Sequence, residues 1–271
     1  MIQSRSISNK TAIAGVIEAL LMVALVAIVI SIIQVVYIPQ VMNQKEADHM
    51  DNVANQFSFL KAVVDLQSMT EKDVPISSPI TLGSRELPYF VTAKAYGELR
   101  ILDNVGRIEV DYAPIVTLTS IKYEAFNSYF VRQIYVLEGG GIIVKQPDGD
   151  PVMRVDPMIT VKNETTEIDI YFDIPIIIGV PGKNITSGYE GCFIRTNYSN
   201  KIQGSLTGIN SILITTEYPD AWNESLYNFL GDNVNIEKGS NYVEVTEKVK
   251  QINLYYKEIY IYAQISPGWT K

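Results

Sequence analysis

The side chains that most often perform catalysis are scarce in this chain. It has one histidine, His49, and one cysteine, Cys192. A single histidine leaves no basis for a multi-histidine metal site. We expect His49 to be a solvated helix residue and not a metal ligand or the base of a Ser-His-Asp or Cys-His site. Cys192 has no partner for an intramolecular disulfide, so we expect a small buried side chain; a lipidated or intermolecularly bridged cysteine is the alternative.

Three other groups could do chemistry but are better explained as structure. The glycine run 139–141 lacks the Lys-Ser/Thr pair of a phosphate-binding loop, which favours a tight turn. Glu167, Asp169 and Asp173 could pair as acid and base, but on an alternating strand they predict a solvated face. The Asp-Gly-Asp turn 148–150 could hold calcium only weakly, since no further carboxylates follow at spaced positions. The sequence therefore predicts no enzyme, no cofactor and no metal site.

An almost unbroken apolar run extends from Ala12 to Ile38 and is interrupted by one acid, Glu18. As a helix it is about 40 Å long, more than the ~30 Å hydrocarbon core of a bilayer. A secretory signal has a shorter apolar region of about 7–15 residues, followed by a cleavage site of small residues. The run therefore predicts a helix that crosses the lipid bilayer of a cell membrane once.

The residues around the run predict its orientation. The preceding tail carries Arg5 and Lys10 and no acid, which favours a cytoplasmic N-terminus. The net charge of the chain is −8, so the part after the run is acidic, and we expect it outside the cell. An acidic exterior gives no support for nucleic-acid binding.

Pro39 ends the apolar run, but a helical pattern continues after it. Apolar side chains recur at three- and four-residue spacing on one face: Met50, Val53, Ala54, Phe57, Leu60, Val64 and Met69. Polar side chains largely fill the other face: Gln44, Lys45, Asp48, Asp51, Asn52, Gln56 and Lys61. We expect one long helix over residues 12–70 with a bend near Pro39, because proline lacks a backbone donor and clashes with the preceding turn.

From about residue 75 the pattern changes to that of β structure. The clearest strand is 167–174, where four apolar side chains alternate with polar ones. In strand 254–265, isoleucines oppose a tyrosine-rich face, which we expect to be half-buried; a ligand-binding face is the alternative. Further strands are expected at 99–103, 107–112, 115–123, 129–137, 142–146, 158–163, 191–196, 201–216 and 242–246. With one helix at 219–230, this predicts a mostly antiparallel β-sandwich-like domain and an α+β fold class.

The stretch AIAGVIEALLM, which begins at Ala12, resembles the start of archaeal type IV pilin-like proteins, whose pattern is close to A-V-S-E-V-I-G-A-I-L-L. The phrases SPITLG, LEGGGIIVKQPDG and YPDAW are similar to stretches of archaeal surface proteins of this type. The resemblance implies a long helix before a β-rich domain, other pilin-like subunits as partners, and cutting by a prepilin-type peptidase. The family has its acid where Gly15 stands here, and glycine where this chain has Glu18.

Glu18, Gly15 and Pro39 are the candidates for helix assembly. In filament-forming pilins, a glutamate near the mature N-terminus pairs with the amino terminus of a neighbouring subunit, and the resemblance implies this role for Glu18. A cut after Ala12, Ile13 or Ala14 leaves Glu18 sixth, fifth or fourth. The alternative is a carboxyl group that lies near the inner membrane interface and extends towards the headgroups, or stays protonated.

Four N-x-S/T sequons lie in the outer part, at Asn163, Asn184, Asn197 and Asn223, and are candidates for glycosylation. A fifth, at Asn9, falls on the cytoplasmic side.

Four parts are therefore expected: a cytoplasmic tail (1–11), a transmembrane helix (12–38), an amphipathic stalk helix (39–72) and an extracellular β-rich domain (73–271). Two functions fit them. The first is a pilin-like structural protein, with a minor pilus subunit favoured because the domain is large. The second is a single-pass binding module that does not polymerise and recognises a partner or a glycan. A surface hydrolase ranks third.

Overall fold

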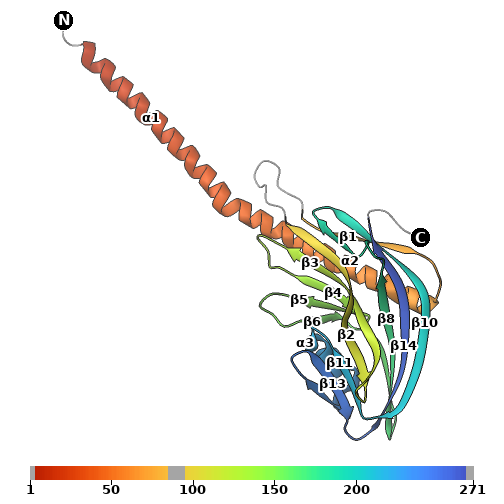
Figure 1. The fold of residues 1–271 in the computed structure, drawn as a ribbon. Coiled ribbons are helices and arrows are strands. Elements are labelled where there is room, and N and C mark those ends of the chain that lie inside the picture. The colour runs from red at the N-terminus through yellow and green to blue at the C-terminus, as the bar shows by residue number, and fades with distance from the viewer. Residues whose placement is uncertain (1–3, 85–94, 267–271) are drawn as a thin grey trace.

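The structure, a computed structural model, describes residues 4–84 and 95–266, and the side chains from residue 14 onward. Helix α1 (Ser4–Ile32), a π-helical turn (Ile33–Tyr37) and helix α2 (Ile38–Thr70) follow one another without a break. They form a rod whose first half projects from the β domain and whose second half runs along it (Figure 1). The expected long helix is confirmed, although it begins earlier than expected, at Ser4.

The irregularity expected at Pro39 takes the form of the π-helical turn directly before it. The Ile38 N–H donates to the carbonyl of Ile33, five residues back. In a regular helix the proline ring would meet the carbonyl four residues earlier, that of Val35, which lies inside this turn. The wider π turn therefore provides the adjustment that a proline inside a long helix requires.

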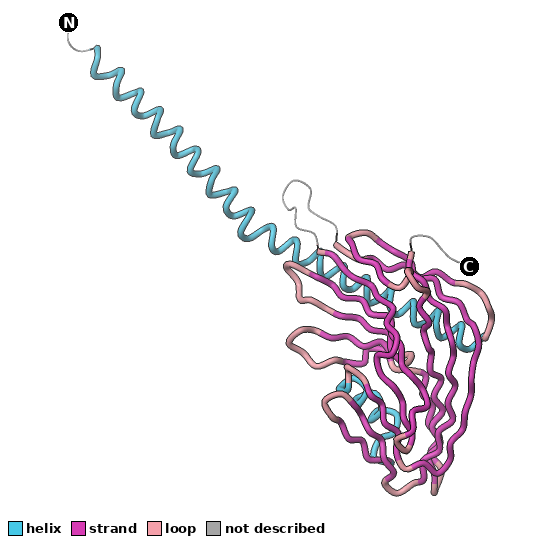
Figure 2. The backbone as a smooth tube through the Cα atoms, in the orientation of Figure 1, coloured by secondary structure: helices cyan, strands magenta, loops and turns pink. Residues whose placement is uncertain are grey.

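In its described residues the β domain contains two sheets and one further helix (Figure 2). The first sheet has the strand order β1-β10-β14-β8-β7, formed by β1 (Ile76–Thr81), β7 (Met158–Asn163), β8 (Glu167–Gly179), β10 (Gly191–Ile209) and β14 (Gln251–Ile265). The second has the order β12-β13-β11-β2-β3-β4-β5-β6, with β9 (Ile185–Gly188) beside β2. Its strands are β2 (Tyr96–Val110), β3 (Ala113–Phe126), β4 (Ile134–Glu138), β5 (Gly141–Lys145), β6 (Val152–Val155), β11 (Ser211–Thr215), β12 (Val234–Lys238) and β13 (Tyr242–Glu247). Helix α3 (Pro219–Leu230) lies where it was predicted and is followed by a 3-10 turn (Gly231–Asn233).

The strand pairings are antiparallel with one exception, so the predicted fold class is confirmed. β8 and β14 run parallel, with Tyr171 opposite Tyr255 and Asp173 opposite Lys257. Parallel neighbours need a long connection between them. Here that connection includes β10, which pairs with the other side of β14, and several strands of the second sheet. The exception was not predicted, because a strand's own sequence does not specify which strand becomes its neighbour.

Two hydrophobic clusters hold the domain together. In the first, the inward side chains of β8 meet the second sheet and α3, with Phe172 against Trp222. The predicted inward set of β8 is confirmed: Ile168, Ile170, Phe172 and Ile174 are all buried. In the second cluster, Phe57, Leu60 and Val64 of α2 pack against both sheets.

The predicted division of the stalk helix into a buried apolar face and a solvent-exposed polar face is correct at most positions and wrong at three. Met69 is 73% exposed, because it lies in the last turn of α2. Lys61 and His49 were expected in solvent but are buried at 6% exposure each. Because α2 touches β1, β8 and β10 on one side and β4 and β5 on the other, its buried surface is wider than a single stripe.

Candidate functional site

Between Val16 and Val36 the projecting half of the rod exposes apolar side chains on every side, interrupted by Glu18, Ser31 and Gln34. The large apolar side chains exposed between Val16 and Val36 have exposed fractions of 47–74%. A helix that is apolar on every side suits lipid or the interior of an assembly and not water. The chain therefore has one N-terminal helix that is long and apolar enough to cross a membrane.

The structure does not bring the three assembly candidates together. Glu18 and Gly15 lie on the projecting half, both exposed, and a Cβ added to Gly15 would meet no atom within 4 Å. Pro39 is half-buried where the rod reaches the β domain, beside the buried Ile38. At 1.5 Å per residue, Glu18 and Pro39 are about 30 Å apart along the axis. Any joint role of these residues therefore needs a second molecule.

A buried carboxylate fixes the rod to the β domain near the point of entry. Glu46 of α2 is fully buried and accepts the backbone N–H groups of Ser128 (3.1 Å), Tyr129 (2.7 Å) and Phe130 (2.7 Å). Asn43, one turn earlier, donates to the Tyr129 carbonyl at 2.8 Å. Hydrogen bonds of N–H groups to an ionised carboxylate are among the strong ones. The loop between β3 and β4 is thereby held on α2, which sequence reasoning did not anticipate.

His49 takes part in the same attachment, so the expectation of a solvated histidine was wrong. Its Nε2 lies 3.0 Å from the Tyr123 hydroxyl, and that hydroxyl donates to the Leu82 carbonyl at 2.8 Å. The Tyr123 hydroxyl thus links the ring of His49 on α2 to the backbone of Leu82. Burial lowers the pKa of His49, and the Leu82 carbonyl and the charge of Glu46 oppose this effect. The arrangement is that of a packed neutral histidine.

A groove of about 870 Å³ lies across β7, β8, β14 and β10, beside the last turn of α2. Its floor comes from the side chains of β8 and β14 that point away from the buried isoleucines. Tyr171 and Tyr255 stack there, with ring centroids 4.8 Å apart and ring planes at 12°. The ammonium group of Lys162 lies 4.9 Å from the centroid of the Tyr171 ring, a cation–π distance.

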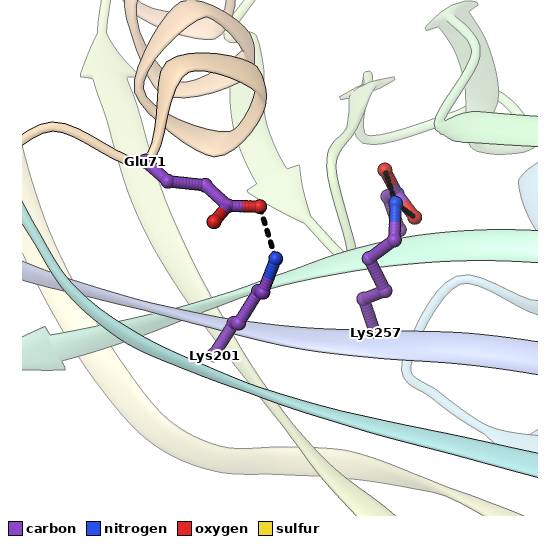
Figure 3. A network of polar contacts seen from close by, with 4 residues as sticks. Glu71, Lys201 and Lys257 are labelled. Carbon is purple, nitrogen blue, oxygen red and sulfur yellow. Dashed lines mark hydrogen bonds and ion pairs between the residues drawn. The ribbon is translucent and has the colours of Figure 1, made fainter.

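Charged groups on either side of the tyrosines neutralise one another. Lys257 pairs with Asp173 at 3.0 Å inside the groove, and Lys201 pairs with Glu71 at 2.5 Å at its rim, just beyond α2 (Figure 3). Asn253, which is buried, donates to Glu167 and Asp169 at 2.8 Å each. The three acids expected on a solvated face are thus half-buried and partnered.

Sequence reasoning did not find this groove, although part of the signal was present. The alternation of strand 167–174 already placed Tyr171 on its polar side. The parallel pairing of β8 with β14 then brings Tyr255 beside it. The tyrosines singled out on the last strand have other positions: Tyr256 and Tyr260 pack against the first hydrophobic cluster, and Tyr262 is 47% exposed.

The other chemical candidates remain structural. Cys192 is buried, as predicted, and burial raises the pKa of its thiol to about 12, so it is a poor nucleophile. The glycine run forms the turn between β4 and β5. Within the described part of the chain, no group of three His, Cys, Asp or Glu residues could hold a metal ion.

The four sequons differ in accessibility. Asn163 is exposed at the end of β7, whereas Asn184, Asn197 and Asn223 are half-buried. The Asn197 amide donates to Asp73. In the Asn223 sequon, Ser225 is fully buried and donates to Asp156 at 2.7 Å. Asn163 is therefore the most exposed of the four, although its amide also donates to Asn233 at 3.1 Å, while the side chain of Asn9 lies outside the described residues.

Comparison of the chain with protein-family models, with curated proteins and with solved structures finds no match in any of the three.

Proposed function

We propose that this protein is a membrane-anchored, pilin-like surface subunit, with its N-terminus in the cytoplasm and its β domain outside the cell. One observation carries the proposal: a single continuous helix is bare and apolar in its first half and built into the β domain in its second. Moving a Val, Leu or Ile side chain from water into an apolar environment is worth about 1.5–3 kcal/mol. The bare half therefore requires lipid or other helices around it.

The rigid connection supports a subunit that displays its domain at a fixed angle. The Glu46 and His49 contacts and the Phe57 cluster hold α2 against the domain over much of its length. A flexible tether would suffice for a simple anchor. A fixed angle between helix and domain is what a repeating assembly needs, because each copy must present the same surface. The size of the domain favours a minor subunit over the major one.

The first experiment is N-terminal mass spectrometry of the protein purified from native membranes. A mature start between Ala12 and Gly15 is expected if a prepilin-type peptidase processes the chain. An intact start at Met1 or Ile2 would contradict processing and leave a plain membrane anchor.

The second experiment addresses assembly through Glu18. Glu18→Ala should leave expression and membrane insertion unchanged but abolish any filament seen by electron microscopy of whole cells. Gln34→Ala, which removes another exposed polar side chain of the apolar segment, is the matched control and should leave filaments intact. Normal filaments from the Glu18 variant would refute the pairing role.

The groove across β7, β8, β14 and β10 favours a second candidate function. In this account the protein is a single-pass surface module that captures a ligand without polymerising. An unprocessed N-terminus together with saturable ligand binding at the groove would support it over the first.

A further inference from the structure

The stack of rings in the groove is closed at one end and open at the other. Lys162 covers the outer face of Tyr171, and Tyr171 covers one face of Tyr255. On the far side of Tyr255, the position opposite it on β10 is Ser205. A serine side chain is too small to cover a phenol ring, so the second face of Tyr255 is left available to a ligand.

Polar groups surround this open face. Gln203 and Ser205 are exposed side chains of β10 on the same side of the sheet as Tyr255, and no hydrogen bond to either side chain occurs among the residues described. The ion pair of Asp173 with Lys257 lies two residues further along the strands, on the same face of the sheet. A carboxylate in such a pair keeps lone pairs that can accept further hydrogen bonds. The ring is thus bordered by an amide, a hydroxyl and a carboxylate.

The charges determine which class of ligand fits. The lysines that line the groove or its rim are already engaged, Lys162 by the Tyr171 ring and the other two by carboxylates. Lys162 also lies opposite Asp169 in the pairing of β7 with β8, so an anionic ligand would find no cation without a carboxylate beside it, and a cationic ligand would meet the ammonium groups of Lys162 and Lys257. A purely apolar ligand would bury Gln203 and Ser205 without partners, which is unfavourable. The remaining match is a neutral molecule with an apolar face and a rim of hydroxyl groups.

We infer that the groove binds a neutral pyranose saccharide, with one sugar ring stacked on the open face of Tyr255. The C–H face of a pyranose lies flat on an aromatic ring, while its hydroxyls reach Gln203, Ser205 and Asp173. A volume of about 870 Å³ falls in the range of small-molecule sites and accommodates more than one sugar unit. This inference is independent of whether the protein polymerises, so its failure would leave the assembly proposal unaffected.

The free edge of β10 suggests a rival occupant. Over Lys201–Ile209, β10 pairs with β14 on one side, and the described strands provide no partner on the other. An extended peptide could add to such an edge through backbone hydrogen bonds. Only the saccharide uses the open ring of Tyr255, so the two occupants can be separated by mutation.

The test is saturation-transfer difference NMR with the full-length protein in a detergent without a sugar headgroup. The probes are maltotriose, cellotriose, mannotriose and chitotriose, each titrated to about 10 mM, which covers the weak affinities expected of a small ligand. The expected result is binding of at least one trisaccharide, with saturation transferred to its ring C–H protons.

Four variants locate the binding. Tyr255→Ala should weaken binding about tenfold, because a stacked ring contact is worth about 1.5 kcal/mol at most. Tyr255→Phe keeps the ring and should retain affinity. Ser205→Trp, at an exposed position, should block the open face and abolish binding without disturbing the fold. Tyr262→Ala removes an exposed tyrosine from the opposite face of β14 and should have no effect.

Two results would overturn the inference. One is the absence of binding by all four trisaccharides, whether or not a synthetic Thr-Val repeat peptide binds the edge of β10. The other is saccharide binding that persists in Ser205→Trp, which would place the sugar elsewhere.

Discussion

Replacing Glu46 tests how the rod is attached to the β domain. The carboxylate is fully buried and accepts three backbone N–H groups from residues 128–130. Glu46→Gln keeps one oxygen, which can still accept two of the three, but turns an amide donor towards the remaining N–H. Glu46→Ala removes every acceptor.

The expected magnitudes follow from the number of bonds lost. A hydrogen bond to a charged group contributes about 1.5–3 kcal/mol, and an unsatisfied buried donor costs about 1–3 kcal/mol. We therefore expect the free energy of unfolding to fall by about 1–2 kcal/mol in Glu46→Gln and by about 3 kcal/mol in Glu46→Ala. For a domain of this size, about 3 kcal/mol lowers the melting temperature by about 6–12 °C.

The assay is thermal unfolding of the full-length protein in detergent, followed by near-ultraviolet circular dichroism. Glu71→Gln is the matched control, since Glu71, the residue directly after α2, is also a glutamate that joins the rod to the β domain but does so through an exposed ion pair with Lys201. It should change the melting temperature little, because exposed ion pairs contribute little. Equal melting temperatures for wild type and Glu46→Ala, or an equal loss in Glu71→Gln, would refute the account of the attachment.

Two further predictions concern stability. His49 should make stability depend on pH: its pKa in the folded state is below the ordinary value of 6.5, so its contribution is complete above pH 6.5 and is lost as the pH falls through the folded-state pKa. The free energy of unfolding, measured with denaturant between pH 7 and pH 5, should therefore fall less with decreasing pH in His49→Gln than in wild type. An equal pH dependence in the two proteins would contradict the burial argument. Gly139→Ala should destabilise the fold more than Gly182→Ala: both glycines have positive φ (55° and 77°), but a Cβ at Gly139 would lie 2.9 Å from the Trp222 ring, whereas one at Gly182 meets nothing. If the melting temperatures of the two variants fell equally, the strain of an alanine at positive φ would explain both losses, and the predicted contact with Trp222 would be refuted as a cause.

The sequence by itself determined the elements whose signal is local. The apolar run from Ala12 to Ile38 specifies a helix by its length and composition, and the alternation in 167–174 specifies which side chains of β8 face the core. Helix α3 was predictable because Pro219 and Asp220 mark its start and Trp222 and Leu226 give it one apolar side. In each case, neighbours within a few residues carry the information.

The tertiary structure alone decided the features that join distant segments. Nothing near Glu46 in the sequence indicates that the backbone of residues 128–130 will surround its carboxylate, and a helical period does not reveal that His49 faces Tyr123. Tyr171 and Tyr255 became neighbours only because β8 and β14 pair in parallel in one register. Side-chain periodicity specifies the face of an element, whereas strand order and register depend on the packing of the whole chain. The groove is a product of that packing.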